Sequence, residues 1–65
     1  MKILLNKIMI NKNLSIRQVA ILTGVSKSTV QRIANNEISP TADTLEHLAK
    51  GLKVRIYDLI ESEYK

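Results

Sequence analysis

The stretch IRQVAILTGVSKSTVQRIANN, which begins at Ile16, constrains the fold more than any other part of the chain. Ser15, followed three residues later by Gln18, has the capping-box pattern that satisfies backbone N–H groups at a helix start. Gly24 can adopt the left-handed conformation that ends a helix without a Cβ clash. Because Ser26 then supplies a second N-cap, the pattern predicts two short helices joined by a tight turn.

The second of these helices is predicted to run from about Lys27 to Asn35. Val30 and Ile33 repeat at helical spacing and form one buried stripe. The other residues of this segment up to Ile33 are polar: Lys27, Ser28, Thr29, Gln31 and Arg32. A short helix, a tight turn and a second helix with a polar face are the layout of a DNA-reading helix-turn-helix.

Charge is distributed unevenly around this motif. The net charge is +4, but six basic residues and no acidic residue precede Glu37. From Glu37 onward, six acidic residues outnumber four basic ones. Since the positive half contains the two-helix motif, double-stranded DNA is the predicted partner.

Length and composition exclude several other classes. A chain of 65 residues predicts a single domain over residues 1–65. The lack of cysteine excludes disulfides and thiolate metal sites, and no cofactor, metal or small-molecule ligand is expected. Asn6 and Lys7 interrupt the apolar N-terminus, so we expect a cytoplasmic protein without a signal peptide or membrane span.

Glu46 and His47 are candidates for a proton-transfer pair. Adjacent residues on a helix do not face each other, however, and no nucleophile accompanies these two, which predicts that the chain is not an enzyme.

Hydrophobic spacing predicts three further helices and hence an all-α fold. The first covers the first dozen residues, with one stripe formed by Met1, Leu5, Ile8 and Met9. A later helix is capped by Thr41 and directs four side chains inward: Leu45, Leu48, Ala49 and Leu52. The last runs roughly from Ile56 to Glu61.

With these residues in view, the chain resembles the Cro/C1-type helix-turn-helix family, the phage-repressor-like regulators of bacteria, over nearly its whole length. The matching positions are Leu14, Ser15, Val19, Ala20, Gly24, Val25, Ser26, Asn35, Pro40, Thr41, Leu45, Leu48, Ala49, Lys50, Leu52, Val54 and Leu59. The resemblance implies a compact five-helix, lambda-repressor-like domain with the helix-turn-helix at helices 2 and 3. It also implies a sequence-specific transcriptional regulator, a small Cro-like repressor or controller that binds a palindromic operator as a homodimer.

The family's binding mode places helix 3 in the major groove, where every base pair presents a distinct hydrogen-bonding pattern. It implies base contacts from Lys27, Ser28, Thr29 and Arg32, with Gln31 at the edge. Arg32 has the strongest case, because its planar fork matches guanine O6 and N7; the alternative is a solvated surface residue. Lys27 opposes the helix dipole near the helix start, so a phosphate contact is its alternative.

Phosphate contacts are expected from Arg17, from Asn35 and from the N–H groups at the start of helix 2. Three departures from the family pattern affect this expectation. Ile16 stands where relatives usually have a phosphate-binding Gln, while Glu37 and Ile38 stand where many have Lys or Arg. A second hypothesis is therefore a protein-interaction module of the same fold, such as an antitoxin or anti-repressor component, with weak DNA contact.

Two packing expectations also follow from the resemblance. Met9 and Ala34 replace a charged pair found in several relatives, so Met9 is predicted to pack near Ala34 as an apolar contact. Positive φ is predicted at Asn36, at Lys53 or at both, where relatives commonly have Gly. On that basis Asn36→Gly is expected to be near neutral.

Surplus apolar residues predict the surface for self-association. Five short helices do not need all of them in one core, and such a surplus often marks an interface. The predicted members of this surface are Ile3, Leu4, Ile10, Tyr57, Ile60 and Tyr64.

Overall fold

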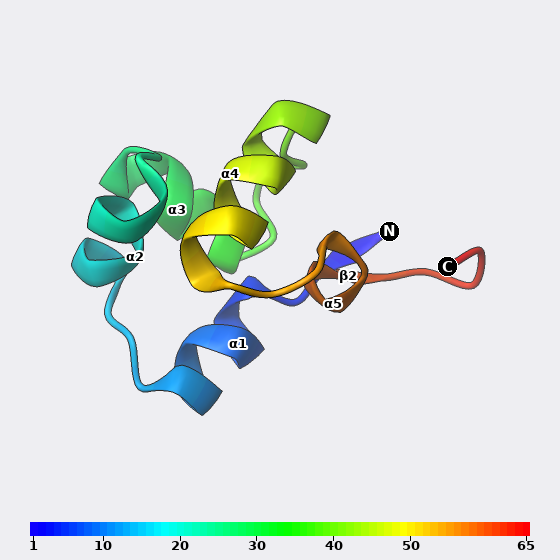
Figure 1. Ribbon diagram of the computed structural model, residues 1–65. Helices are drawn as coiled ribbons and strands as arrows, with labels where there is room; N and C mark the ends of the chain where they lie inside the picture. Colours follow the sequence, from blue (N-terminus) through cyan, green and yellow to red (C-terminus); the bar gives the residue numbers. More distant parts are fainter.

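Five helices and one small antiparallel sheet make up the fold. The computed structural model describes residues 1–65, with the elements β1 (Lys2–Ile3), α1 (Leu5–Lys12), α2 (Ile16–Thr23), α3 (Lys27–Ala34), α4 (Ala42–Leu52), α5 (Ile56–Leu59) and β2 (Ile60–Glu61). In Figure 1, α2 and α3 lie at the left, α4 above, α1 below, and the sheet with both chain ends at the right. The all-α prediction is confirmed, with the two-residue strands as the only addition.

The starts of α2, α3 and α4 are fixed by the predicted caps. In each, a hydroxyl oxygen accepts a hydrogen bond from the backbone N–H three residues later: 3.1 Å at Ser15, 3.4 Å at Ser26 and 3.2 Å at Thr41. These bonds satisfy N–H groups that have no partner within a helix. The helix-turn-helix therefore begins and turns at the residues that its sequence predicts.

The ends of α1, α3 and α4 share one left-handed geometry. Positive φ occurs directly after α1 and α4, with 56° at Asn13 and 57° at Lys53, and at the second residue after α3, with 58° at Asn36. In α3, the Glu37 N–H donates to the Arg32 carbonyl at 2.8 Å and the Asn36 N–H to the Ile33 carbonyl at 3.0 Å, which is a Schellman motif. The prediction of positive φ is thus confirmed at both of its positions.

One apolar core joins all the elements. Met9 and Ala34 are both buried in it, and α1 packs against α3, as predicted for an apolar replacement of a charged pair. The buried cluster consists of Ile3, Leu5, Met9, Val19, Val30, Ile33, Ala34, Leu45, Leu48, Leu52 and Leu59. Its members come from one strand and every helix, so a small core holds the whole chain together.

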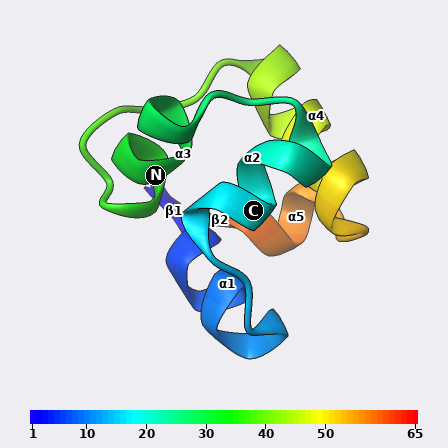
Figure 2. The same cartoon turned by 90° about the vertical axis from the view of Figure 1, so that its left-hand side faces the viewer.

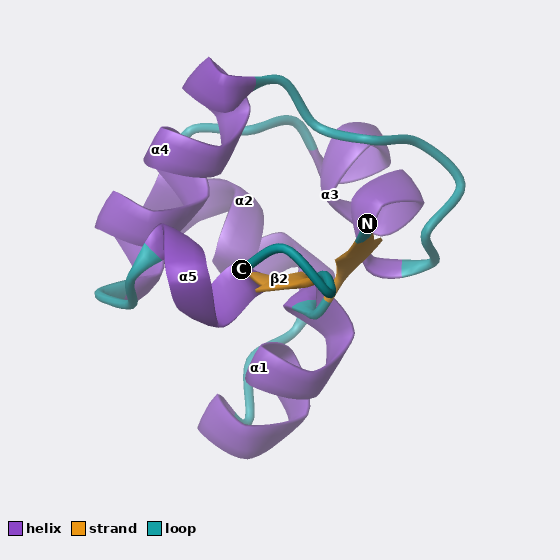
Figure 3. Cartoon of the chain, turned by 90° about the vertical axis from the view of Figure 1, so that its right-hand side faces the viewer, coloured by secondary structure: helices purple, strands orange, loops and turns teal.

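The two ends of the chain differ from the prediction. The first helix begins at Leu5, not Met1, because residues 2 and 3 pair with β2: Lys2 lies opposite Glu61 and Ile3 opposite Ile60. This pairing also ends the last helix at Leu59 and leaves Met1 exposed. The two strands pair in antiparallel orientation, and Figure 3 shows both of them above α1 in this view.

Ile3 was predicted to be surplus surface, and this prediction is wrong. The strand turns its side chain into the core, where only 3% of it remains exposed. The neighbouring Leu4 N–H donates to the Leu59 carbonyl at 2.7 Å, so the backbone here is satisfied by the other end of the chain.

Candidate nucleic-acid interface

The start of α2 combines two available backbone donors with a cation. The capping box is complete, because the Ser15 N–H also donates to Gln18 Oε1 at 2.8 Å. Of the four N–H groups at the helix start, those of Ile16 and Arg17 are left without a partner in the helix. Since the Arg17 side chain is exposed at the same place, this end of α2 can bind an anion.

Thr23 fixes the turn between α2 and α3. Its side chain is 6% exposed, and its hydroxyl donates to the Val19 carbonyl at 2.7 Å while it accepts from the Val25 N–H at 3.2 Å. The same hydroxyl therefore links the last turn of α2 to the residue that precedes the cap of α3. Figure 2 shows the two helices from the side on which they lie, with the turn joining them.

One face of α3 is polar and open to solvent. The opposite face carries Val30, Ile33 and Ala34 into the core. Positions 27, 28, 31 and 32 fall within one side of a helix at 100° per residue. The four exposed side chains on that side are Lys27, Ser28, Gln31 and Arg32.

Thr29 differs from these four predicted base readers. It is only partly exposed, and its hydroxyl accepts a hydrogen bond from Ser26 Oγ at 2.9 Å. Its backbone N–H also bonds to Ser26. Thr29 is therefore the partner of the N-cap residue Ser26 and lies at the border of the exposed face of α3.

Asn35, which is predicted to contact phosphate, lies just past the end of α3 and is exposed. Its side-chain amide donates to Glu37 Oε2 at 3.2 Å. The amide keeps a second N–H, but a carboxylate at this distance opposes a phosphate electrostatically. Of the two predicted phosphate contacts, Arg17 thus has the more favourable surroundings.

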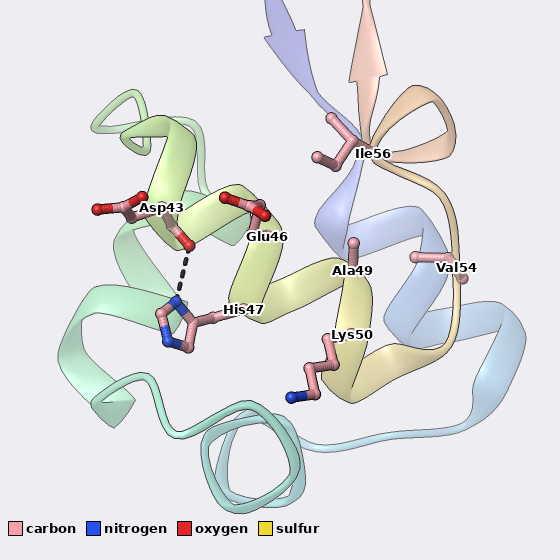
Figure 4. Close-up of a pocket in the computed structure, with 7 residues that line it drawn as sticks. All are labelled: Asp43, Glu46, His47, Ala49, Lys50, Val54 and Ile56. Atoms are coloured by element: carbon pink, nitrogen blue, oxygen red, sulfur yellow. Dashed lines mark hydrogen bonds between the residues drawn. The ribbon is translucent and has the colours of Figure 1, made fainter.

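A shallow depression of about 470 Å³ lies elsewhere, along α4 and the segment that leads to α5. His47 Nδ1 lies 2.7 Å from the Asp43 carbonyl of its own helix, and Figure 4 shows Glu46 extending in a different direction from His47. The lining residues are Asp43, Glu46, His47, Ala49, Lys50, Val54 and Ile56. None of them belongs to the exposed face of α3.

Comparison with known proteins agrees with this geometry. The model of the family described as Cro/C1-type HTH DNA-binding domain matches residues 4–64, which is nearly the whole chain. No curated protein and no solved structure matches the chain significantly. None of the helices has both the length and the apolar character needed to cross a membrane.

Proposed function

The chain belongs to the Cro/C1-type helix-turn-helix family of DNA-binding domains, and we propose that it is a sequence-specific transcriptional regulator that uses α3 to recognise bases. The observation that carries the proposal is the exposed side of α3, which presents Arg32 and Lys27 beside the amide of Gln31. These groups supply the donors and acceptors that distinguish base pairs in the major groove.

In this proposal, base contacts and phosphate contacts come from different helices. Arg32 donates two hydrogen bonds to guanine, with Ser28 and Gln31 at neighbouring bases. Arg17 and the two N–H groups at the start of α2 hold a backbone phosphate and fix the register of α3 in the groove. Lys27 serves either the bases or a phosphate, and Thr29 contributes from within the cap.

The regulatory part of the proposal is a small Cro-like repressor that binds a palindromic operator as a homodimer. One α3 contacts few base pairs, so two copies are needed to specify a site of useful length. A symmetric dimer matches the symmetry of a palindrome, with its half-sites one turn of duplex apart.

Two arginine variants test the proposal after a preferred duplex has been selected from a random pool. Arg32→Ala is expected to cost about 1 to 3 kcal/mol on the selected duplex and to relax the preference at one base pair in each half-site. Arg17→Ala is expected to weaken selected and random duplexes alike and to lower the salt slope by about one unit per subunit contact. Equal losses on both duplexes for Arg32→Ala would mean that α3 is not the reading helix.

A protein-interaction module is the second candidate function, and exposed apolar residues in α2 favour it. Ile21 is 75% exposed and Leu22 52% exposed, and Glu37 with Ile38 follows the end of α3. Duplex titrations over a range of salt separate the two functions, because each neutralised phosphate contributes a log-log slope of about −0.9. A flat response would favour the interaction module.

A further inference from the structure

Asn36 makes a contact that its position at a helix end does not require. Its side-chain Oδ1 accepts from the Ile3 N–H at 2.9 Å, and its Nδ2 donates to the Ile3 carbonyl at 3.1 Å. The two residues are 33 positions apart. A side-chain amide that bonds both main-chain groups of one residue takes the place of a neighbouring strand.

This contact closes the outer edge of β1. Ile3 lies opposite Ile60, while the Leu4 N–H bonds to the Leu59 carbonyl on the β2 side. In an antiparallel pair, successive residues direct their main-chain groups to alternate sides, so those of Ile3 point away from β2. Asn36 satisfies both of them, and they would otherwise be an unpaired strand edge.

The same residue forms the end of α3. Asn36 has φ 58°, and its N–H closes the Schellman motif on the Ile33 carbonyl at 3.0 Å. Asn36 thus has a left-handed backbone conformation, one backbone hydrogen bond and two side-chain hydrogen bonds, and it lies two residues past the end of the proposed recognition helix. Because Ile3 is itself paired to β2, Asn36 connects the end of α3 to both ends of the chain.

We propose that Asn36 is a positioning residue for base recognition: its amide fixes the angle of α3 by tying the helix end to β1. This inference rests on the DNA-binding function proposed above. The α3 helix has two turns, and its first turn is held by Ser26 and the packing of α2. The other end is held by the buried side chains of Ile33 and Ala34 and by the hydrogen bonds between Asn36 and Ile3. Packing fixes the depth of the helix end but not its angle, so loss of these hydrogen bonds lets the arginine and glutamine side chains of α3 shift relative to the base edges.

Asn13 provides a matched control for substitutions of Asn36. Asn13 has the same left-handed conformation after α1, with φ 56° and the same pair of backbone bonds, but lies away from the recognition helix. Asn36→Gly and Asn13→Gly both replace an Asn by the residue most tolerant of positive φ. Only Asn36→Gly removes the tie to Ile3.

The experiment measures the affinity of the full chain for the selected duplex and for a random duplex, at a temperature where unfolding curves show each variant to be folded. Asn36→Gly is expected to lower the ratio of the two affinities by about three- to tenfold. Asn13→Gly is expected to leave the ratio unchanged. Hydrogen exchange at the Ile3 amide is expected to accelerate in Asn36→Gly alone.

Asn36→Asp serves as a second variant should Asn36→Gly fold poorly. It keeps an acceptor for the Ile3 N–H and the tolerance of positive φ but loses the donor to the Ile3 carbonyl, so an intermediate ratio is expected. A folded Asn36 variant with lower stability and an unchanged ratio would show that the tie is only structural and would overturn the inference. A wild-type protein without preference between the duplexes would instead refute the proposed function.

Discussion

At the scale of single residues, Gly51 sets how closely α2 and α4 approach. A Cβ built on Gly51 would lie 2.5 Å from the Leu22 carbonyl oxygen and 2.8 Å from the Thr23 Cα. Both are backbone atoms, so the contact cannot be relieved by rotating a side chain. The glycine is therefore required by helix packing, while the left-handed position two residues later is occupied by Lys53.

Gly51→Ala is expected to destabilise the fold by about 1 to 3 kcal/mol through overpacking, even though alanine is favoured over glycine by about 1 kcal/mol within a helix. Denaturant unfolding measures the difference. Gly24→Asn is the control, because a Cβ there meets nothing within 4 Å, so this change carries only the backbone cost of a φ of 78°, which is smaller for Asn than for most residues. A stabilised Gly51→Ala variant would mean that α2 and α4 are farther apart than described.

Residue-scale features could be predicted only where the partner was close in sequence. The cap at Ser15 and the positive φ at Asn36 each follow from a local pattern, and both are present. The amide of Asn36 could not be assigned, because its partner is a strand residue 33 positions away. For that reason the expectation of a neutral Asn36→Gly does not agree with the structure, in which this change removes two hydrogen bonds.

At the scale of elements, helices and strands differed in how well they could be predicted. The exposed side of α3 follows from residue types at helical spacing, so most of the candidate site could be inferred from the sequence. The strands could not, since each is two residues long and β1 pairs with a segment near the opposite end of the chain. The apolar residues at the N-terminus fit the spacing of a helix as well as that of a strand. For this reason Met1 was predicted to lie on the buried stripe of the first helix, whereas it is exposed.

A pair of isoleucines tests whether β1 is part of the fold. Ile3 is 3% exposed and Ile10 is 70% exposed. Ile3→Ala is expected to cost about 2 to 5 kcal/mol, because it removes buried methyl groups and leaves a cavity. Ile10→Ala is expected to change stability by less than about 0.5 kcal/mol, as is usual for a surface position. Equal effects in urea unfolding would place the N-terminus outside the core.

At the scale of the whole molecule, the burial of Ile3 removes this residue from the surface that was predicted for self-association. Leu4 and Ile60 are half-buried, whereas Ile10, Tyr57 and Tyr64 are exposed. Ile56 in α5 adds further exposed apolar surface, at 40%. Lys65 Nζ lies 4.7 Å from the centre of the Tyr57 ring, so the C-terminal residues already fold back over this region.

We expect two copies to meet through the exposed side chains of α5 and the C-terminal residues. Burying apolar surface that the monomer leaves in water provides the driving force. Such a dimer binds both half-sites of an operator only if it places the two α3 helices about 34 Å apart on one side of the duplex.

Sedimentation with increasing protein concentration is expected to show a dimer, and Tyr57→Ser is expected to weaken both dimerisation and operator binding. Ile21→Ser is the control, because Ile21 is also an exposed hydrophobic residue, at 75%, but lies in α2, so this change should leave the dimer intact. A chain that remains monomeric both free and on its operator would contradict the homodimer, and a dimer insensitive to Tyr57→Ser would place its interface on another face.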